Sequence, residues 1–229
     1  MSQSSFGKKF TVTTWGESHG KALGAVVDGC PAGLSLEEKD IQAFLDRRRP
    51  GQSRYTTTRK EGDEVEILSG GFEGKTTGTP ISLMVRNTDQ RSRDYGNIAY
   101  SYRPGHADYT YDQKYGFRDY RGGGRSSGRE TTGRVAAGAI AAKLLRELGI
   151  TFCTYTRSIG PVSVSSFDEK EIQNSAFYMP DTEAAAKAGE YLEQCMKNHD
   201  SAGGVIECRI QGVPAGLGDP VFGKLDAEL

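Results

Sequence analysis

The sequence has no stretch that approaches the roughly 20 apolar residues a helix needs to cross a bilayer, and residues 1–10 carry no apolar signal segment. Cysteine is scarce, and its four copies stand singly, without a C-x-x-C pair. These absences predict a cytoplasmic protein whose cysteines are free thiols. They also argue against a metal site, because no histidine stands at metal-ligand spacing from a cysteine.

Other signatures are missing as well. No internal repeat, linker or low-complexity tract divides the 229 residues, a length that suits one large domain or two modest ones. No G-x-x-x-x-G-K-[ST] run is present, which disfavours an ordinary P-loop. Only three histidines occur. A histidine placed beside a charged loop is therefore a specific candidate for proton exchange near neutral pH.

Positive charge is concentrated in one part of the chain, although the net charge of the whole is −1. Residues 47–134 hold 14 Arg and 3 Lys against 11 acidic residues, a net +6, whereas the remainder carries 12 basic and 19 acidic residues, a net −7. Domains that bind nucleic acid usually have a pI above about 9. The pI of 6.3 and the preference for arginine, whose planar fork matches phosphate and carboxylate, indicate a compact anion instead.

Local patterns predict an α+β fold. Strands are predicted at residues 10–15, 23–27, 65–68, 81–85, 151–156, 161–164 and 205–210. Helices are predicted after a capping box at residues 35–38, after a second box at 127–130 and over 183–197, and residues 224–229 resemble the start of another. The second helix should pack through Val135, Ala139, Ala142, Leu145 and Leu148. Irregular spacing of these elements favours mostly antiparallel sheets.

The densest chemistry lies between Arg103 and Thr131. Five arginines (103, 118, 121, 125 and 129) fall within thirty residues, more positive charge than a folded segment needs for its own stability. The glycines at 122–124 permit positive φ angles, so that backbone N–H groups can converge on an anion at the start of the predicted helix. The alternative is a flexible loop with solvated charge. An irregular segment as long as 87–125 is usually functional or disordered, and its many Tyr and Arg residues favour function.

Two histidines are candidates for acid–base chemistry. His106 lies among the arginines, and His19 lies in a glycine-bounded loop; His199 follows a helix and is assigned a structural role. Arg47, Arg48, Arg49 and Arg54 would serve equally well as a solvated helix end or as part of an anion site. The residues alone thus predict an enzyme for a small polyanion, and they do not reveal its reaction.

Several segments resemble the chorismate synthase family. Residues 16–31 are similar to the family's first signature and residues 124–140 to its second. Shorter motifs match in order at residues 46–54, at 78–80 with 87–89, and at 103–108. Gly128 and Gly133 depart from the family pattern. That pattern leads us to expect alanine at position 128 and a bulkier residue at position 133. The likeness covers 6–229 and implies the N-terminal two-thirds of such a protein, a single domain over 1–229 that is incomplete at its C-terminus.

The resemblance implies a β-α-β sandwich-like α+β fold and a lyase activity. The family converts 5-enolpyruvylshikimate 3-phosphate to chorismate and phosphate by a 1,4-anti elimination that needs reduced FMN. This is the last common step of the shikimate pathway toward aromatic amino acids. A cytoplasmic homotetramer, with NADPH as a candidate reductant, is implied as well. The alternative is a truncated flavin- or phosphate-binding module without turnover.

The resemblance also assigns roles to individual residues. His106 would protonate the departing phosphate, and His19 would protonate or hydrogen-bond the reduced flavin. Arg125, Ser126 and Ser127 match positions that contact FMN. Arg48 and Arg54 match positions for substrate anions or for NADPH, and Arg103 and Arg129 would clamp the substrate. No metal is implied.

Overall fold

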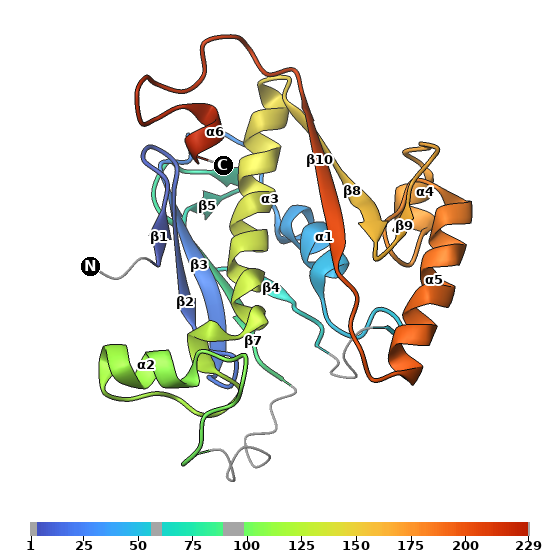
Figure 1. The fold of residues 1–229 in the computed structure, drawn as a ribbon. Helices are drawn as coiled ribbons and strands as arrows, with labels where there is room; N and C mark the ends of the chain where they lie inside the picture. Colours follow the sequence, from blue (N-terminus) through green and yellow to red (C-terminus); the bar gives the residue numbers. More distant parts are fainter. Residues whose placement is uncertain (1–3, 56–60, 89–98, 229) are drawn as a thin grey trace. The chain divides into compact units, whose positions relative to one another are not determined.

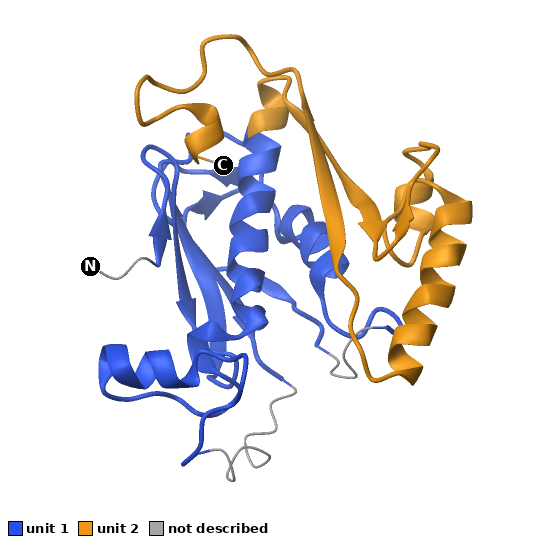
Figure 2. Ribbon diagram, viewed as in Figure 1, with its two compact units in different colours: residues 1–144 blue, residues 145–229 orange. Residues whose placement is uncertain are grey.

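The structure is a computed structural model that describes residues 4–55, 61–88 and 99–228. The chain divides into two compact units, residues 1–144 and 145–229 (Figure 2). Each unit has a sheet and an apolar cluster of its own. That the chain forms one domain stays a prediction.

The first unit is built on a five-stranded sheet with the order β1-β2-β3-β7-β4 (Figure 1). Its strands are β1 (Ser5–Phe6), β2 (Thr11–Gly16), β3 (Ala22–Asp28), β4 (Val65–Ile67) and β7 (Ile81–Arg86). Alternate residues of β3 and β7 are buried and lie opposite one another, as in the pairs Leu23 with Val85 and Ala25 with Leu83. Because side chains alternate between the faces of a sheet, this register gives one continuous apolar face.

Two helices contribute to the core over this face. Helix α1 (Glu38–Arg48) buries Ile41 and Leu45, and α3 (Thr131–Glu147) buries a stripe that includes Ala136, Ala137 and Ile140. The face predicted for α3 was right in part: Ala139 is buried and Val135 packs against the core, but Ala142 and Leu145 are only half-buried and Leu148 is 67% exposed. The observed stripe is lined by glycine and alanine, so the helix backbone approaches the sheet closely.

Both predicted capping boxes differ from the observed ones. Glu37 caps α1 and forms its box with Asp40, because Ser35 is occupied in a β-bridge with Lys75. Ser127 does act as a cap, but on a single 3-10 turn, η3 (Gly128–Glu130), that precedes α3. Glu130 does not reach back to it.

Other elements of the first unit were not predicted. A small hairpin pairs β5 (Gly71–Phe72) with β6 (Lys75–Thr76). Within the segment assigned as irregular lie helix α2 (Asp108–Tyr115) and the 3-10 turn η2 (Gly124–Ser126). Part of that segment, including Asp89 of the family motif, lies outside the described residues.

The second unit has a three-stranded sheet with the order β10-β8-β9. The strands are β8 (Thr151–Ile159), β9 (Val162–Ser163) and β10 (Gly204–Gln211); the helices are α4 (Glu171–Asn174), α5 (Thr182–Lys197) and α6 (Leu225–Glu228). Its cluster includes Tyr155, Met179 and Ala188. All strand pairs in the described parts of both units are antiparallel, which confirms the α+β class.

The four cysteines Cys30, Cys153, Cys195 and Cys208 are free thiols, as predicted. In the part of the chain that the structure describes, no helix has the length and apolar content required to span a membrane.

Candidate anion-binding site

Three successive glycines of the first unit form a cradle in which several predicted site residues meet. Gly122, Gly123 and Gly124 have φ angles of 64°, 87° and 55°, in the left-handed region that glycine adopts without strain. A Cβ atom on Gly122 would lie 2.1 Å from the ring of His19. One on Gly123 would lie 3.1 Å from Oγ of Ser126 and 3.6 Å from Nη2 of Arg103. Gly122 is thus required because the ring of His19 approaches its backbone this closely, and all three glycines suit the positive φ angles.

His19 is buried in the turn that follows β2. Its Nδ1 lies 3.2 Å from Oγ of Ser18, and that hydroxyl also donates to the carbonyl of Gly122. The amide of Asn87 closes the turn by donating to the carbonyls of Glu17 (3.0 Å) and Gly20 (2.9 Å). The histidine ring is therefore held by the glycine cradle on one side and by a fixed turn beneath it.

Arg103 and His106 lie in the turn before α2. Arg103 donates from Nε (2.9 Å) and Nη2 (2.8 Å) to the two carboxylate oxygens of Asp108. These hydrogen bonds hold the pKa of Asp108 well below its ordinary value of 3.8, and the charge of the nearby Arg118 adds to the effect. His106 is exposed, and its Nδ1 lies 3.0 Å from the carbonyl oxygen of Pro104.

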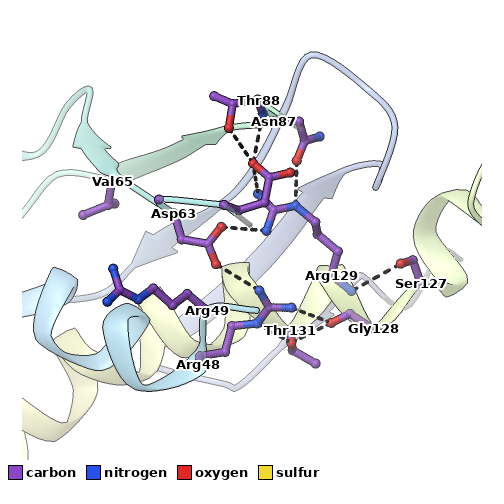
Figure 3. Close-up of polar contacts among 12 residues, drawn as sticks. Arg48, Arg49, Asp63, Val65, Asn87, Thr88, Ser127, Gly128, Arg129 and Thr131 are labelled. Carbon is purple, nitrogen blue, oxygen red and sulfur yellow. Dashed lines mark hydrogen bonds and ion pairs between the residues drawn. The ribbon is translucent and has the colours of Figure 1, made fainter. Parts of the chain in front are cut away.

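A buried ionic cluster joins the end of α1 to the turn before α3 (Figure 3). Arg129 donates from Nη1 to Oδ1 of Asp63 (2.6 Å) and from Nε to Oδ1 of Asn87 (2.7 Å). Arg48 donates to the other carboxylate oxygen of Asp63 (3.0 Å), to the carbonyl of Gly128 (3.2 Å) and to the hydroxyl of Thr131 (3.1 Å). The side chain of Arg129 is 4% exposed and that of Arg48 is 20% exposed. We name the side chains of Arg48, Glu61, Asp63, Asn87 and Arg129 the arginine cluster.

The remaining predicted residues have partners that differ from one another. Arg125 donates to the carbonyl of Gly16 and to Oγ1 of Thr14 (2.7 Å), so its guanidinium group braces the end of β2. Ser126 donates to the carbonyl of Gly123 (2.6 Å), and Oγ of Ser127 accepts from the backbone of Arg129. Arg54 contacts the ring and the hydroxyl of Tyr55. The described contacts thus place Arg125, Ser126 and Ser127 beside the cradle, but do not bring Arg54 to it.

The arginine-rich segment is not a bare cationic surface. Each of its five arginines lies within 3.8 Å of a carboxylate oxygen: Arg103 and Arg118 near Asp108, Arg121 near Asp119, Arg125 near Glu130, and Arg129 near Asp63. The expectation that this charge exceeds what the segment needs for its own stability was therefore partly wrong. Arg118, which is buried under α2, has an evident structural use.

Sequence reasoning missed the acidic half of the site. Glu61 and Asp63 are 5% and 2% exposed, and both sit within the basic window just before β4. A signal was available. Glu61 and Asp63 are separated by one residue and stand just before a strand with alternating apolar residues, and such acids are buried only when they are paired with a base such as a nearby arginine. Their partners could not have been read from the sequence.

An apolar cavity of about 410 Å³ lies beside β1, β2 and α3. Phe6, Phe10, Val12 and Ala137 contribute to its wall, and the paired side chains of Glu130 and Arg134 also line it. Because its lining holds a single cation already paired with a carboxylate, we do not include it in the anion site.

The sequence model of the family described as chorismate synthase matches residues 10–229. The chain is 68% identical over 231 aligned positions to a chorismate synthase of Agathobacter rectalis, and 66% identical to that of Lachnoclostridium phytofermentans. Each alignment covers 100% of this chain and 63% of the relative, so the chain spans about 63% of the length of these curated relatives.

A solved crystal structure of a chorismate synthase is similar as well. It is 33% identical in sequence and superposes with a TM-score of 0.74. The match covers 93% of this chain and 60% of that one. Taken with the match to the family's sequence model, this shows that the chain belongs to the chorismate synthase family.

Proposed function

We propose that the complete gene product converts 5-enolpyruvylshikimate 3-phosphate to chorismate and inorganic phosphate by a 1,4-anti elimination. The observation that carries the proposal is the glycine cradle, which brings His19, Ser126 and Arg103 to one loop of the chain. A trianionic substrate needs several oriented cations, and here carboxylates of the chain itself orient the arginines. Membership of the family supports the choice of substrate.

The same residues fit a bound reduced FMN. The hydroxyl of Ser126 and the guanidinium group of Arg103, which are suited to a phosphate, lie beside the backbone of the cradle. We propose that Arg125, Ser126 and Ser127 hold the cofactor. When bound, reduced FMN would supply electron density transiently to a reaction that involves no net change of oxidation state.

The chain's own residues manage anions and protons. His106 is assigned to the proton delivered to the departing phosphate; its Nδ1 is next to the carbonyl of Pro104, so Nε2 is the atom left for that transfer. Arg103, Arg48, Arg54 and Arg129 are assigned to the substrate's phosphate and carboxylates or, for Arg48 and Arg54, to NADPH. His19, buried against the cradle, is assigned to a hydrogen bond or proton at the flavin.

Phosphate release from the enolpyruvyl substrate tests the proposal, measured anaerobically with chemically reduced FMN and the complete gene product. We expect His106→Ala to slow release by about 10²- to 10⁴-fold, the usual contribution of a general acid, with flavin binding nearly unchanged. His199→Ala, which lies in the second unit, is the matched control and should retain the wild-type rate. Equal loss of turnover and flavin binding in His106→Ala would instead indicate a structural role.

Absence of release by the wild-type complete product would overturn the proposal. Release by that product together with flavin binding but no release by residues 1–229 would support the alternative, a binding module, for this part of the chain. The homotetramer implied by the family is part of the same proposal, and light scattering of the complete product checks it. Oxidation of NADPH in the presence of FMN would decide whether the protein reduces its own flavin.

A further inference from the structure

We propose that Asp63 is the positioning residue of the arginine cluster, which sets the orientation in which Arg48 and Arg129 bind an anionic substrate. The proposal rests on the function proposed above, because that function assigns these two arginines to substrate anions. Asp63 would act through the arginines.

Arg48 and Arg129 share the carboxylate of Asp63. Oδ1 of Asp63 accepts from Arg129 at 2.6 Å, and Oδ2 accepts from Arg48 at 3.0 Å, so a single side chain fixes both guanidinium groups relative to each other (Figure 3). The Asp63 side chain is 0% exposed and that of Arg129 is 4% exposed. A buried arginine without a counter-charge would carry a large desolvation penalty, so Arg129 depends on this carboxylate.

The backbone of Asp63 has a φ angle of 49°. Glycine adopts this left-handed conformation freely, and asparagine and aspartate tolerate it, whereas other residues are strained by it. Aspartate at such a position gains nothing from its backbone over asparagine. The difference between the two is the negative charge, and that charge is what the two arginines contact.

The turn that bears Asp63 is anchored on the helix that bears Arg48. Gln42 of α1 accepts from the backbone N–H of Val65 (3.1 Å), and its amide nitrogen lies 3.5 Å from the carbonyl oxygen of Gly62. These contacts bracket Asp63 from both sides. The carboxylate is therefore fixed relative to α1 independently of its ion pairs, as a positioning group must be.

One donor group of Arg129 is not used by the cluster. Arg129 uses Nε and Nη1, while its buried Nη2 has no hydrogen-bond partner among the described residues. The carboxylate of Glu61 is 3.8 Å from Nη2 and accepts instead from the backbone and hydroxyl of Thr88. Arg48, one-fifth exposed, is accessible from solvent. The network orients both guanidinium groups without saturating Arg129.

The decisive variant is Asp63→Asn in the complete gene product, which keeps the shape and the backbone preference but removes the charge. We expect KM for 5-enolpyruvylshikimate 3-phosphate to rise about 10- to 100-fold, the range for a lost charge-assisted contact, with a smaller change in kcat. The matched control is Asp40→Asn. It weakens the Lys143–Asp40 pair, which also links α1 to α3, and should lower the melting temperature without changing KM.

If Asp63→Asn does not fold, Asp63→Glu retains the charge and shifts the carboxylate by one methylene, and it should still raise KM. A wild-type KM in the folded variant, with only a lower melting temperature, would reduce Asp63 to a structural role and overturn the proposal. A second readout is independent of the substrate: the guanidinium Nη–H NMR signals of Arg48 and Arg129 should lose their protection from exchange in Asp63→Asn, because Asp63 accepts from Nη1 of both residues. Unchanged protection would overturn the positioning role, whereas a wild type that neither binds nor converts the substrate would overturn the proposed function.

Discussion

The contact between Gly122 and His19 leads to a quantitative prediction. In Gly122→Ala the new methyl carbon would lie 2.1 Å from the imidazole, whereas an ordinary contact is at least 3.4 Å. The ring must therefore withdraw by about 1.3 Å, or the glycine loop must move by a comparable amount. Either response removes the 3.2 Å contact of His19 with the hydroxyl of Ser18 or disturbs it.

The expected effect has a stability part and a rate part. Alanine at a φ angle of 64° costs about 1–2 kcal/mol, and loss of one buried hydrogen bond adds about 1 kcal/mol. We therefore expect the free energy of unfolding to fall by about 2–3 kcal/mol. A reacting group displaced by about 1 Å typically lowers the rate by about 10²-fold, so kcat/KM should fall by about that factor if His19 acts at the flavin.

The assay is anaerobic phosphate release by the complete gene product, together with denaturant unfolding. Gly128→Ala is the control, because Gly128 is six residues further along, has no positive φ angle and would place its Cβ in open space. It should keep the wild-type rate and stability within about 1 kcal/mol. Wild-type kcat/KM and stability in Gly122→Ala would refute the reasoning, since the ring would then not need this space.

Two further predictions concern stability alone. Gly133→Ala would place a Cβ 2.6 Å from the carbonyl oxygen of Gly24, where α3 meets the sheet, and should lower the free energy of unfolding by about 1–3 kcal/mol; an unchanged denaturation midpoint would contradict this close packing. Asp181 caps α5, and hydrogen bonds from the backbones of Ala184, Ser165 and Ser166 hold its pKa well below the ordinary 3.8. Because its folded pKa is depressed, its contribution is present above pH 3.8 and lost as the pH falls further. Asp181→Asn should therefore be less stable than wild type by about 1–2 kcal/mol at pH 7, with the gap closing in acid, and a gap independent of pH would argue against the charge.

The strands were predictable because burial of one face of a sheet places an apolar residue at every second position of the strand. The segment at β3 and the segment at β7 show it clearly, and both were placed within a residue or two. Helix α2 was missed because no apolar stripe stabilises it. Asp108, at its first position, is paired with Arg103 and lies 3.5 Å from Arg118, and such contacts leave no periodic trace.

The candidate site, like the fold, could be predicted only in part from the sequence. Motifs identified the arginines and histidines, since residue type and spacing are local properties. The partners of those arginines are not local: Arg129 and Asp63 are 66 positions apart, and Arg48 and Thr131 are 83 apart. Which acid neutralises which base is decided by the packing of α1, β4 and the start of α3, so the ion pairs could only come from the structure.

The side chain of Asn87 has a consequence for protein engineering. Its amide nitrogen donates to both ends of the turn that bears His19, and its oxygen accepts from the buried Arg129. Aspartate cannot supply the two donors, and leucine, of similar shape, supplies neither donor nor acceptor. The histidine turn and the arginine cluster therefore form one structural unit. A design that places these arginines on another scaffold must include Asn87 and the turn that it holds.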